Sequence, residues 1–238
     1  MANKRALLFV RLGEVPSNKE AEWNNWYNTS HIPNRINNPG FIAARRYTAI
    51  GLESKGECKY LTLYELKTID ALTGENYLKL RDWEASLPSD SFEATTPNLP
   101  NFKRGAYEQI YPEEGNYEIP NSDVLFAVGH DVPQGKDDEF NAWYHTEHMP
   151  AMLNRVPGFI SARHFRIYET KLPPRAGGGY QSFSPKYVSL YDLENERVLE
   201  SEPFLRERNS PWTAWVRSWY SRPFRILARR VSTIYPKR

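Results

Sequence analysis

The chain contains one twelve-residue segment twice. Residues 22–33 read E-W-N-N-W-Y-N-T-S-H-I-P, and residues 139–150 read E-F-N-A-W-Y-H-T-E-H-M-P. Seven of the twelve positions are identical, and they include a Trp, a Tyr and a His. A second echo follows each copy, P-G-F-I-A-A-R at residues 39–45 and P-G-F-I-S-A-R at residues 157–163. Because Trp and His are uncommon residues, the match indicates a tandem duplication.

The duplication sets the expected domain organisation. A chain of 238 residues divides into two units of a common domain size. An acidic, turn-rich segment separates the two copies, as is typical of a domain boundary. We therefore expect a first repeat over residues 1–112, a linker over residues 113–122 and a second repeat over residues 123–238.

Each repeat predicts the order strand, helix, strand, strand, helix, strand. In the first repeat we expect strands at residues 6–12, 41–49, 59–66 and 105–111, and helices from about residue 19 and over residues 69–87. In the second repeat we expect strands at residues 124–128, 159–168 and 186–193, and a last strand that ends near residue 236. The residue before a proline avoids the α region, so Pro33 should break or re-start the first helix and leave His31 at its frayed end. The order is that of the ferredoxin-like βαββαβ fold.

The second repeat also carries an insertion between its second and third strands. This insertion contains Pro173-Pro174 and Gly177-Gly178-Gly179. It lacks the spaced glycines, the Lys-Ser/Thr pair and the helix that a phosphate-binding loop requires. We expect a mobile flap.

Composition narrows the classes of function. The net charge is +2, which leaves no electrostatic footprint for nucleic acid or for an anionic membrane. The sequence has no apolar span of membrane length, and its first apolar run is too short for a signal peptide. The single cysteine, Cys58, excludes an intrachain disulfide and suits a reducing compartment. We expect a cytoplasmic protein whose partner is a small molecule.

The motif W-Y-x-x-x-H-x-P, followed by P-G-F-x-x-A-R, resembles the EthD-like members of the dimeric α+β barrel superfamily. In that superfamily two ferredoxin-like units pair their sheets into a barrel around a buried pocket. The resemblance implies an α+β fold in which the two repeats form an intramolecular dimeric barrel, a pseudodimer, with a homodimer of pseudodimers as a further assembly. Relatives include muconolactone isomerase-like enzymes, small decarboxylases and cyclases, quinol monooxygenases and haem enzymes of the chlorite dismutase type. One fold of this kind hosts many chemistries.

The repeated histidine is the leading candidate for chemistry. The resemblance places the His of W-Y-x-x-x-H-x-P at the pocket, and histidine exchanges protons near neutral pH. Four of the five histidines lie in the second repeat, at positions where the first repeat has Gly13, Asn28, His31 and Arg46. We therefore expect the working pocket in the second repeat, with His148 as its general acid/base. The alternative is a structural histidine that caps a helix end.

Aromatic residues precede each of these histidines. Tyr144 and Tyr27 stand four residues before His148 and His31, so ring and imidazole can share a helix face. A Tyr hydroxyl there could orient a substrate or donate to a developing enolate, or the ring could simply belong to the core. Trp143 is either core or pocket wall.

Two arginines and the remaining histidines complete the candidates. Arg163 and Arg45 close the P-G-F-x-x-A-R segments, and an arginine that faces an aromatic pocket would bind a carboxylate bidentately. The alternative for both is a surface ion pair, and strand alternation leaves the pocket-facing side open. The histidine cluster has the residue types of a metal site, but Pro150 disturbs its helical spacing, so we predict no metal. The cluster comprises His130, His145, His148 and His164.

These features together predict a cofactor-independent isomerase. Its substrate would be a small unsaturated or aromatic-derived carboxylate of the kind met in aromatic-compound catabolism. The expected catalytic residues are His148, Tyr144 and His31, and the expected substrate contacts are His130, His145, His164, Arg163, Trp143, Tyr27 and Arg45. A decarboxylase or lyase, a monooxygenase on the same barrel, and a non-catalytic small-molecule-binding stress protein are the alternatives.

Overall fold

A computed structural model describes residues 4–51, 57–113, 118–168 and 185–237. The insertion with Pro173-Pro174 and the three glycines lies outside the described residues, so the expected flap stays a prediction.

The described strands close into one barrel. Eight strands follow one another in the order β1-β3-β2-β8-β5-β7-β6-β4, and every neighbouring pair is antiparallel. The strands are β1 (Ala6–Leu12), β2 (Phe41–Gly51), β3 (Tyr60–Leu66), β4 (Lys103–Tyr111), β5 (Val124–Asp131), β6 (Phe159–Ile167), β7 (Tyr187–Leu193) and β8 (Ser221–Ile234). This mixed α/β architecture with a closed antiparallel barrel agrees with the expected dimeric α+β barrel.

The two halves of the chain contribute matching sets of strands. The first half runs β4-β1-β3-β2 around the barrel, and the second half runs β6-β7-β5-β8. The halves meet at two seams, where β2 pairs with β8 and β4 pairs with β6. A barrel closed in this way leaves no free sheet edge, which removes the usual site of edge-to-edge aggregation.

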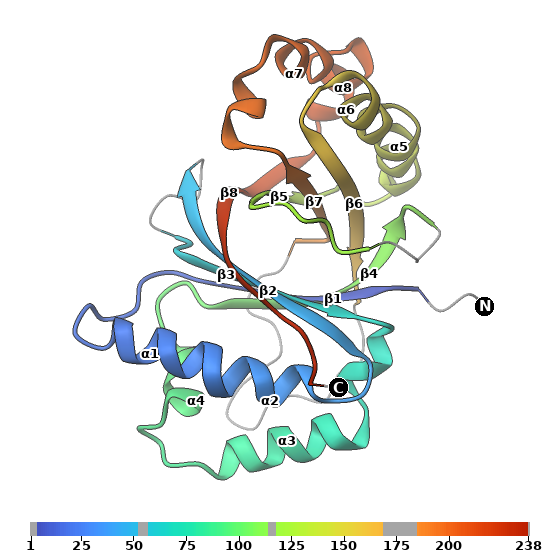
Figure 1. The fold of residues 1–238 in the computed structure, drawn as a ribbon. Coiled ribbons are helices and arrows are strands. Elements are labelled where there is room, and N and C mark those ends of the chain that lie inside the picture. The colour runs from blue at the N-terminus through green and yellow to red at the C-terminus, as the bar shows by residue number, and fades with distance from the viewer. Residues whose placement is uncertain (1–3, 52–56, 114–117, 169–184, 238) are drawn as a thin grey trace.

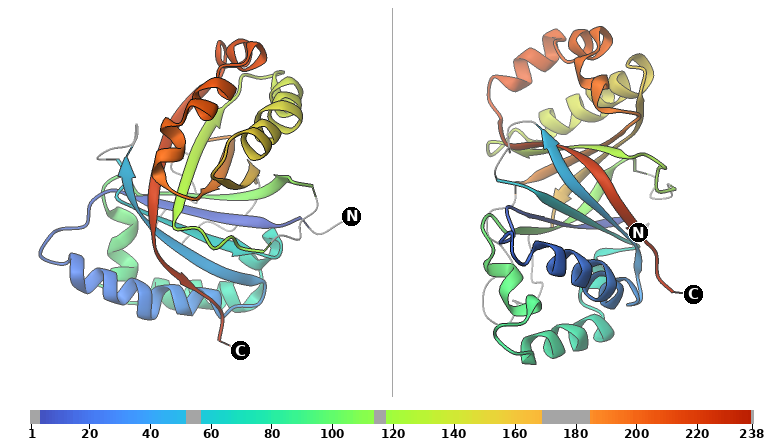
Figure 2. Two further views of the ribbon diagram at one scale, coloured as in Figure 1. Left: turned by 45° about the horizontal axis from the view of Figure 1, so that its top comes forward. Right: turned by 60° about the vertical axis from the view of Figure 1, so that its left-hand side comes forward.

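Helices cover the barrel from two opposite sides (Figures 1 and 2). The first half supplies α1 (Glu20–Trp26), η1 (Tyr27–His31), α2 (Ile32–Ile36), η2 (Ile69–Leu72), α3 (Glu75–Ser86), α4 (Phe92–Thr95) and η3 (Thr96–Asn98). The second half supplies α5 (Asp137–Trp143), η4 (Tyr144–His148), α6 (Met149–Arg155), η5 (Glu196–Glu200), α7 (Glu202–Glu207) and α8 (Pro211–Arg217). Within the described ranges, no helix has the length and apolar character needed to cross a membrane.

Alternate residues of each strand enter different cores. On β1, Leu7 and Phe9 point into the barrel, whereas Leu8 and Val10 pack under the first helical layer. A corresponding core under the second helical layer includes Phe126 and Val128 of β5. Because both faces of these strands are buried, their sequences read as continuous apolar runs.

Of the two alternatives for Pro33, the helix re-starts rather than breaks, and the expectation that His31 lies at a frayed helix end is wrong. In both halves the helix continues through the proline by way of a π-helical turn, η1 and η4. The N–H of Ile32 bonds to the carbonyl of Tyr27, and the N–H of Met149 bonds to that of Tyr144, five residues back in each case. Pro33 and Pro150 then fall in the first turn of α2 and α6, where a missing N–H is tolerated. The repeated tyrosine and histidine therefore stand at the two ends of a π turn, a feature frequent at functional sites.

Candidate functional site

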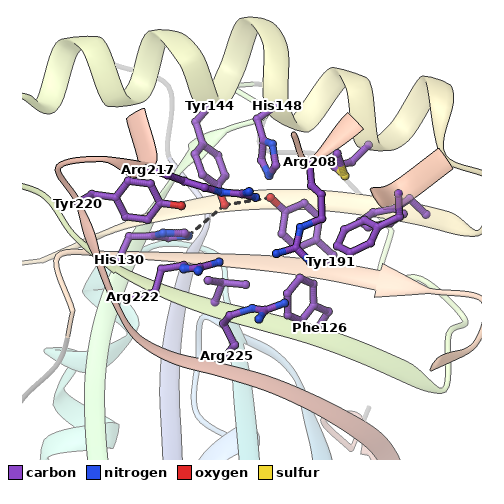
Figure 3. Close-up of a pocket in the computed structure, with 14 residues that line it drawn as sticks. Phe126, His130, Tyr144, His148, Tyr191, Arg208, Arg217, Tyr220, Arg222 and Arg225 are labelled. Atoms are coloured by element: carbon purple, nitrogen blue, oxygen red, sulfur yellow. Dashed lines mark hydrogen bonds between the residues drawn. The ribbon is translucent and has the colours of Figure 1, made fainter. Parts of the chain in front are cut away.

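The second half contains a pocket between the outer face of its sheet and its helical layer (Figure 3). Fourteen residues of the second half line the pocket, which is partly open to solvent. Strands β5, β6, β7 and β8 form its floor, and η4, α6, α7 and α8 form its roof. Its apolar wall consists of Phe126, Val128, Met152, Phe159, Tyr191 and Phe204.

His148 enters this pocket as a free base. It is the last residue of the π turn η4, and its ring stacks on Trp143 with ring centroids 4.7 Å apart. Its Nδ1 is buried, and neither ring nitrogen has a hydrogen-bond partner among the described residues. Burial, together with the nearby charges of Arg217 and Arg208, lowers the pKa of His148 to about 3. The imidazole is therefore neutral and holds an unused lone pair.

Beside His148 lies a row of hydrogen-bonded polar groups. The hydroxyl of Tyr191 donates to that of Tyr144 over 3.0 Å, and the Tyr144 hydroxyl is hydrogen-bonded to Nε2 of His130, 3.0 Å away. The hydroxyl of Ser189 is 3.4 Å from the same nitrogen. Burial lowers the pKa of His130 well below its usual range and raises that of Tyr144. All four groups are uncharged, and together they form a hydrogen-bonded row along the pocket wall.

Four arginines give the pocket its charge. Arg208 follows α7, Arg217 ends α8, and Arg222 and Arg225 lie on β8. None of the described residues that line the pocket is acidic. Burial and the charges of the other three guanidinium groups lower the pKa of Arg208. The pocket is therefore strongly cationic in a chain whose net charge is only +2.

The structure brings some of the predicted second-half residues together. His148, Tyr144 and His130 line the pocket, and Trp143 lies behind His148. His145 and His164 do not line it. His164 stacks on Tyr144, with ring centroids 4.5 Å apart, and its Nδ1 is 2.9 Å from Nε2 of His145.

Arg45 and Arg163 lie in neither of the expected places. Both face the barrel interior, where their side chains are 0% and 2% exposed. Arg45 is 2.7 Å from Glu65 and 2.6 Å from Asp192, and Arg163 is 3.0 Å from Glu65. The ion pairs are thus buried rather than on the surface, and they do not reach the pocket. We name Arg45, Glu65, Arg163 and Asp192 the barrel charge network.

The first half holds a smaller cavity in which charges are paired. His31 stacks on Tyr27 with ring centroids 4.4 Å apart, and its Nδ1 is 2.9 Å from Nη1 of Arg35. Arg35 forms an ion pair of 2.7 Å with Glu84. His31, Glu84 and Glu93 offer ligand atoms within 4.8 Å of one another, a spacing that a metal could use. Arg35 is already bonded to two of them, so we read this cluster as a structural charge network.

Sequence reasoning missed the arginines. They belong to no motif, and they come from three separate elements. A signal was nevertheless present, because seven arginines fall between residues 206 and 230. Tyr191 and Ser189 were also missed, since nothing in the β7 sequence marks their side chains as polar groups of a pocket.

Comparison with sequence families gives a limited match. The family model "Domain of unknown function (DUF4286)" matches residues 10–87, within the first repeat. A search of curated proteins found no match. The EthD-like resemblance therefore stays a prediction.

Comparison with solved structures shows the barrel over almost the whole chain. An anthrone oxidase-like protein has a TM-score of 0.62 and 14% identity, covering 99% of this chain and 94% of its own. A provisionally named chlorite dismutase has a TM-score of 0.60 and 13% identity, covering 97% and 96%. A haem-binding protein from Thermus thermophilus has a TM-score of 0.52 and 12% identity, covering 98% and 92%. At such identities the similarity establishes the fold alone.

Proposed function

We propose that this chain is an isomerase that acts without a cofactor on a small unsaturated or aromatic-derived carboxylate. Its two ferredoxin-like repeats, residues 1–112 and 123–238, build one barrel, and the second repeat carries the working site. One observation supports this most directly. His148 offers a neutral imidazole without a hydrogen bond to a described residue, in a pocket whose described lining has four arginines and no acid.

The arginines explain how so weak a base could work. In the empty pocket the charges of Arg217 and Arg208 oppose protonation of His148. An anionic substrate would offset those charges, and a nearby negative charge favours the protonated imidazole. Substrate binding would therefore raise the pKa of His148 towards the range in which a general base is effective.

The same residues account for both steps of a proton shift, the removal of the proton and its return. His148 takes a proton from a carbon next to a carbonyl or carboxylate group, and the electron pair of the C–H bond moves into an enolate. The guanidinium groups stabilise that negative charge. The hydroxyl of Tyr144 can rotate from His130 to the enolate oxygen. The imidazolium of His148 then returns its proton to a different carbon, so that no cofactor is consumed.

The enolate could also take another course. Reaction of the enolate with O₂ would make the protein a monooxygenase, whereas a decarboxylase would form the enolate by loss of carbon dioxide and would then protonate it from the imidazolium of His148. The fold similarity to an anthrone oxidase-like protein favours the O₂ reaction as the second candidate. All three reactions pass through an enolate, so they share the same site residues.

Haem fits the described residues poorly. A metal-ligating histidine almost always donates its second ring N–H to a fixed acceptor, which orients the ring. His148 has no such acceptor among the described residues, and His130 uses Nε2 for Tyr144 while Nδ1 has no partner there. We derive no step through haem.

The proposal is tested with two probe compounds. Muconolactone is incubated with the protein in D₂O without oxygen, and deuterium incorporation and rearrangement are followed by NMR. Anthrone is supplied in air, and O₂ uptake is recorded. Exchange or rearrangement of muconolactone that is lost in His148→Ala supports the isomerase. O₂ uptake with anthrone, without exchange in muconolactone, replaces it by the monooxygenase. Turnover of neither compound, or turnover that survives in His148→Ala, overturns the proposed role of His148.

A further inference from the structure

We infer that the pocket binds a small dianion with two separate carboxylates on an unsaturated or aromatic frame. This inference deepens the proposed function and rests on it for the identification of the pocket as the substrate site. Its evidence is the arrangement of arginines around the pocket, which the proton transfer itself does not require.

The arginines between residues 206 and 230 divide into two groups. Arginines outside the pocket are paired with acids, as Arg229 is with Glu196 at 2.8 Å and Arg230 with Asp123 at 2.7 Å. Arg206 likewise pairs with Glu202 at 3.1 Å. These pairs show that the chain supplies acids to its surface arginines in this region.

Three of the arginines that face the pocket have no such partner among the described residues. Arg208, Arg217 and Arg222 form no ion pair with any described acid. The Nε atom of Arg217 is buried and has no hydrogen-bond partner among the described residues. Gathering partly buried cations without counter-charges is costly, because burial and mutual repulsion both oppose it. Such an arrangement is retained at a cost to stability, and an anionic ligand would offset that cost.

The positions of the arginines indicate two anionic groups rather than one. Arg208 and Arg217 come from the helical roof, whereas Arg222 lies on β8 in the floor (Figure 3). A single carboxylate bonds bidentately to one guanidinium and leaves the other side of the pocket uncompensated. Two carboxylates on one molecule can neutralise both sides at once.

The rest of the wall indicates what joins the two carboxylates. The rings of Phe126, Phe159, Tyr191 and Phe204 line the same pocket as the arginines. Aromatic rings favour a flat, apolar frame by offset stacking and edge contacts. The frame that joins the two carboxylates is therefore expected to be flat and unsaturated or aromatic.

The test uses probes that cannot undergo the proposed proton transfer. Isophthalate, terephthalate, benzoate and inorganic phosphate are titrated into the protein by calorimetry at low ionic strength. We expect a benzene dicarboxylate to bind at least tenfold more tightly than benzoate and than phosphate. We expect Arg222→Gln to weaken that binding at least tenfold. The surface variant Arg229→Gln is the matched control and should bind as the unmodified protein does.

The outcomes separate this inference from the proposed function. Equal affinity for benzoate and the dicarboxylates, tighter binding of phosphate, no binding of any probe, or an unaffected Arg222→Gln would each overturn the dianion. The probes have no C–H group that His148 could deprotonate, so their binding does not depend on proton transfer. His148→Ala should therefore still bind the dicarboxylate. Dicarboxylate binding combined with failure of the muconolactone and anthrone assays would reject the proposed function and leave the ligand class standing.

Discussion

Arg45 and Asp192 form an ion pair of 2.6 Å across the barrel interior, although 147 positions separate them in the sequence. Arg45 belongs to β2 of the first half, and Asp192 belongs to β7 of the second. Glu65 of β3 makes the reciprocal contact, at 3.0 Å from Arg163 of β6. The barrel charge network therefore joins the two halves through equivalent positions of the repeat.

Breaking this network should be costly. In Asp192→Asn the guanidinium of Arg45 loses a partner in a fully buried site, and we expect the free energy of unfolding to fall by about 3–5 kcal/mol. The control is Asp123→Asn, which removes the partner of Arg230 where the Asp123 side chain is 74% exposed and should cost less than about 1 kcal/mol. Urea denaturation measures both. Equal losses in the two variants would show that the buried pair does not stabilise the barrel.

Acid should destabilise the protein at pH values well above those at which carboxylates titrate. Burial lowers the pKa of His130, His148 and His164, so the unfolded chain binds protons below about pH 6.5 that the folded chain does not. Their stabilising contribution is complete above pH 6.5. As the pH falls from 6.5 towards 5, each should lower the free energy of unfolding by about 1.4 kcal/mol per pH unit.

The non-titrating variant His148→Gln isolates one of these protons. Since the pKa of His148 in the folded chain is about 3, its share of the slope should persist from pH 6.5 down to that value. Urea denaturation between pH 5 and pH 6.5 should show a slope smaller by about 1.4 kcal/mol per pH unit in the variant. Identical slopes would mean that His148 is not held neutral by the fold.

Tyr144 should matter for both stability and turnover. Tyr144→Phe removes the hydroxyl that lies between Tyr191 and His130, which leaves the buried Tyr191 hydroxyl without its acceptor and His130 with only the longer contact to Ser189. We expect a loss of about 1–3 kcal/mol in the free energy of unfolding and a reduction in turnover of about tenfold or more.

A second tyrosine provides the control for that variant. The hydroxyl of Tyr187, on β7, donates over 2.6 Å to Asp137, on α5 of the same helical layer. Tyr187 does not line the pocket. Tyr187→Phe should therefore lose stability and keep its turnover. If both variants lost turnover to the same degree, the effect of Tyr144→Phe would be attributable to folding alone.

The strands could be predicted from the sequence because their signal, a continuous run of apolar residues, is local. The runs predicted at residues 6–12 and 59–66 correspond to β1 and to β3, which begins at Tyr60. Such strands are buried on both faces, so a continuous apolar run identifies them. The repeated W-Y-x-x-x-H-x-P motif likewise marked the pocket-lining His148 and Tyr144.

The remaining features depend on contacts between segments that are distant in the sequence, which a local sequence pattern does not contain. Whether Arg163 faces the barrel or the helices depends on register, and one residue of slip exchanges the two faces. The π turn that carries His148 through Pro150 depends on a backbone bond that spans five residues, which the presence of proline argues against. The pocket arginines are brought together only when α7, α8 and β8 fold over one sheet.

The central claim, that His148 is the base of the only working half, is tested most directly by a matched pair of variants. His148→Ala and His31→Ala remove equivalent residues of the two repeats, one without a hydrogen bond to a described residue and one bonded to Arg35. Deuterium exchange into muconolactone, measured on both, should fall more than about a hundredfold in His148→Ala. It should stay within about threefold in His31→Ala, which instead unfolds at lower urea because Arg35 loses a buried contact. Equal exchange in His148→Ala and the unmodified protein would contradict the account.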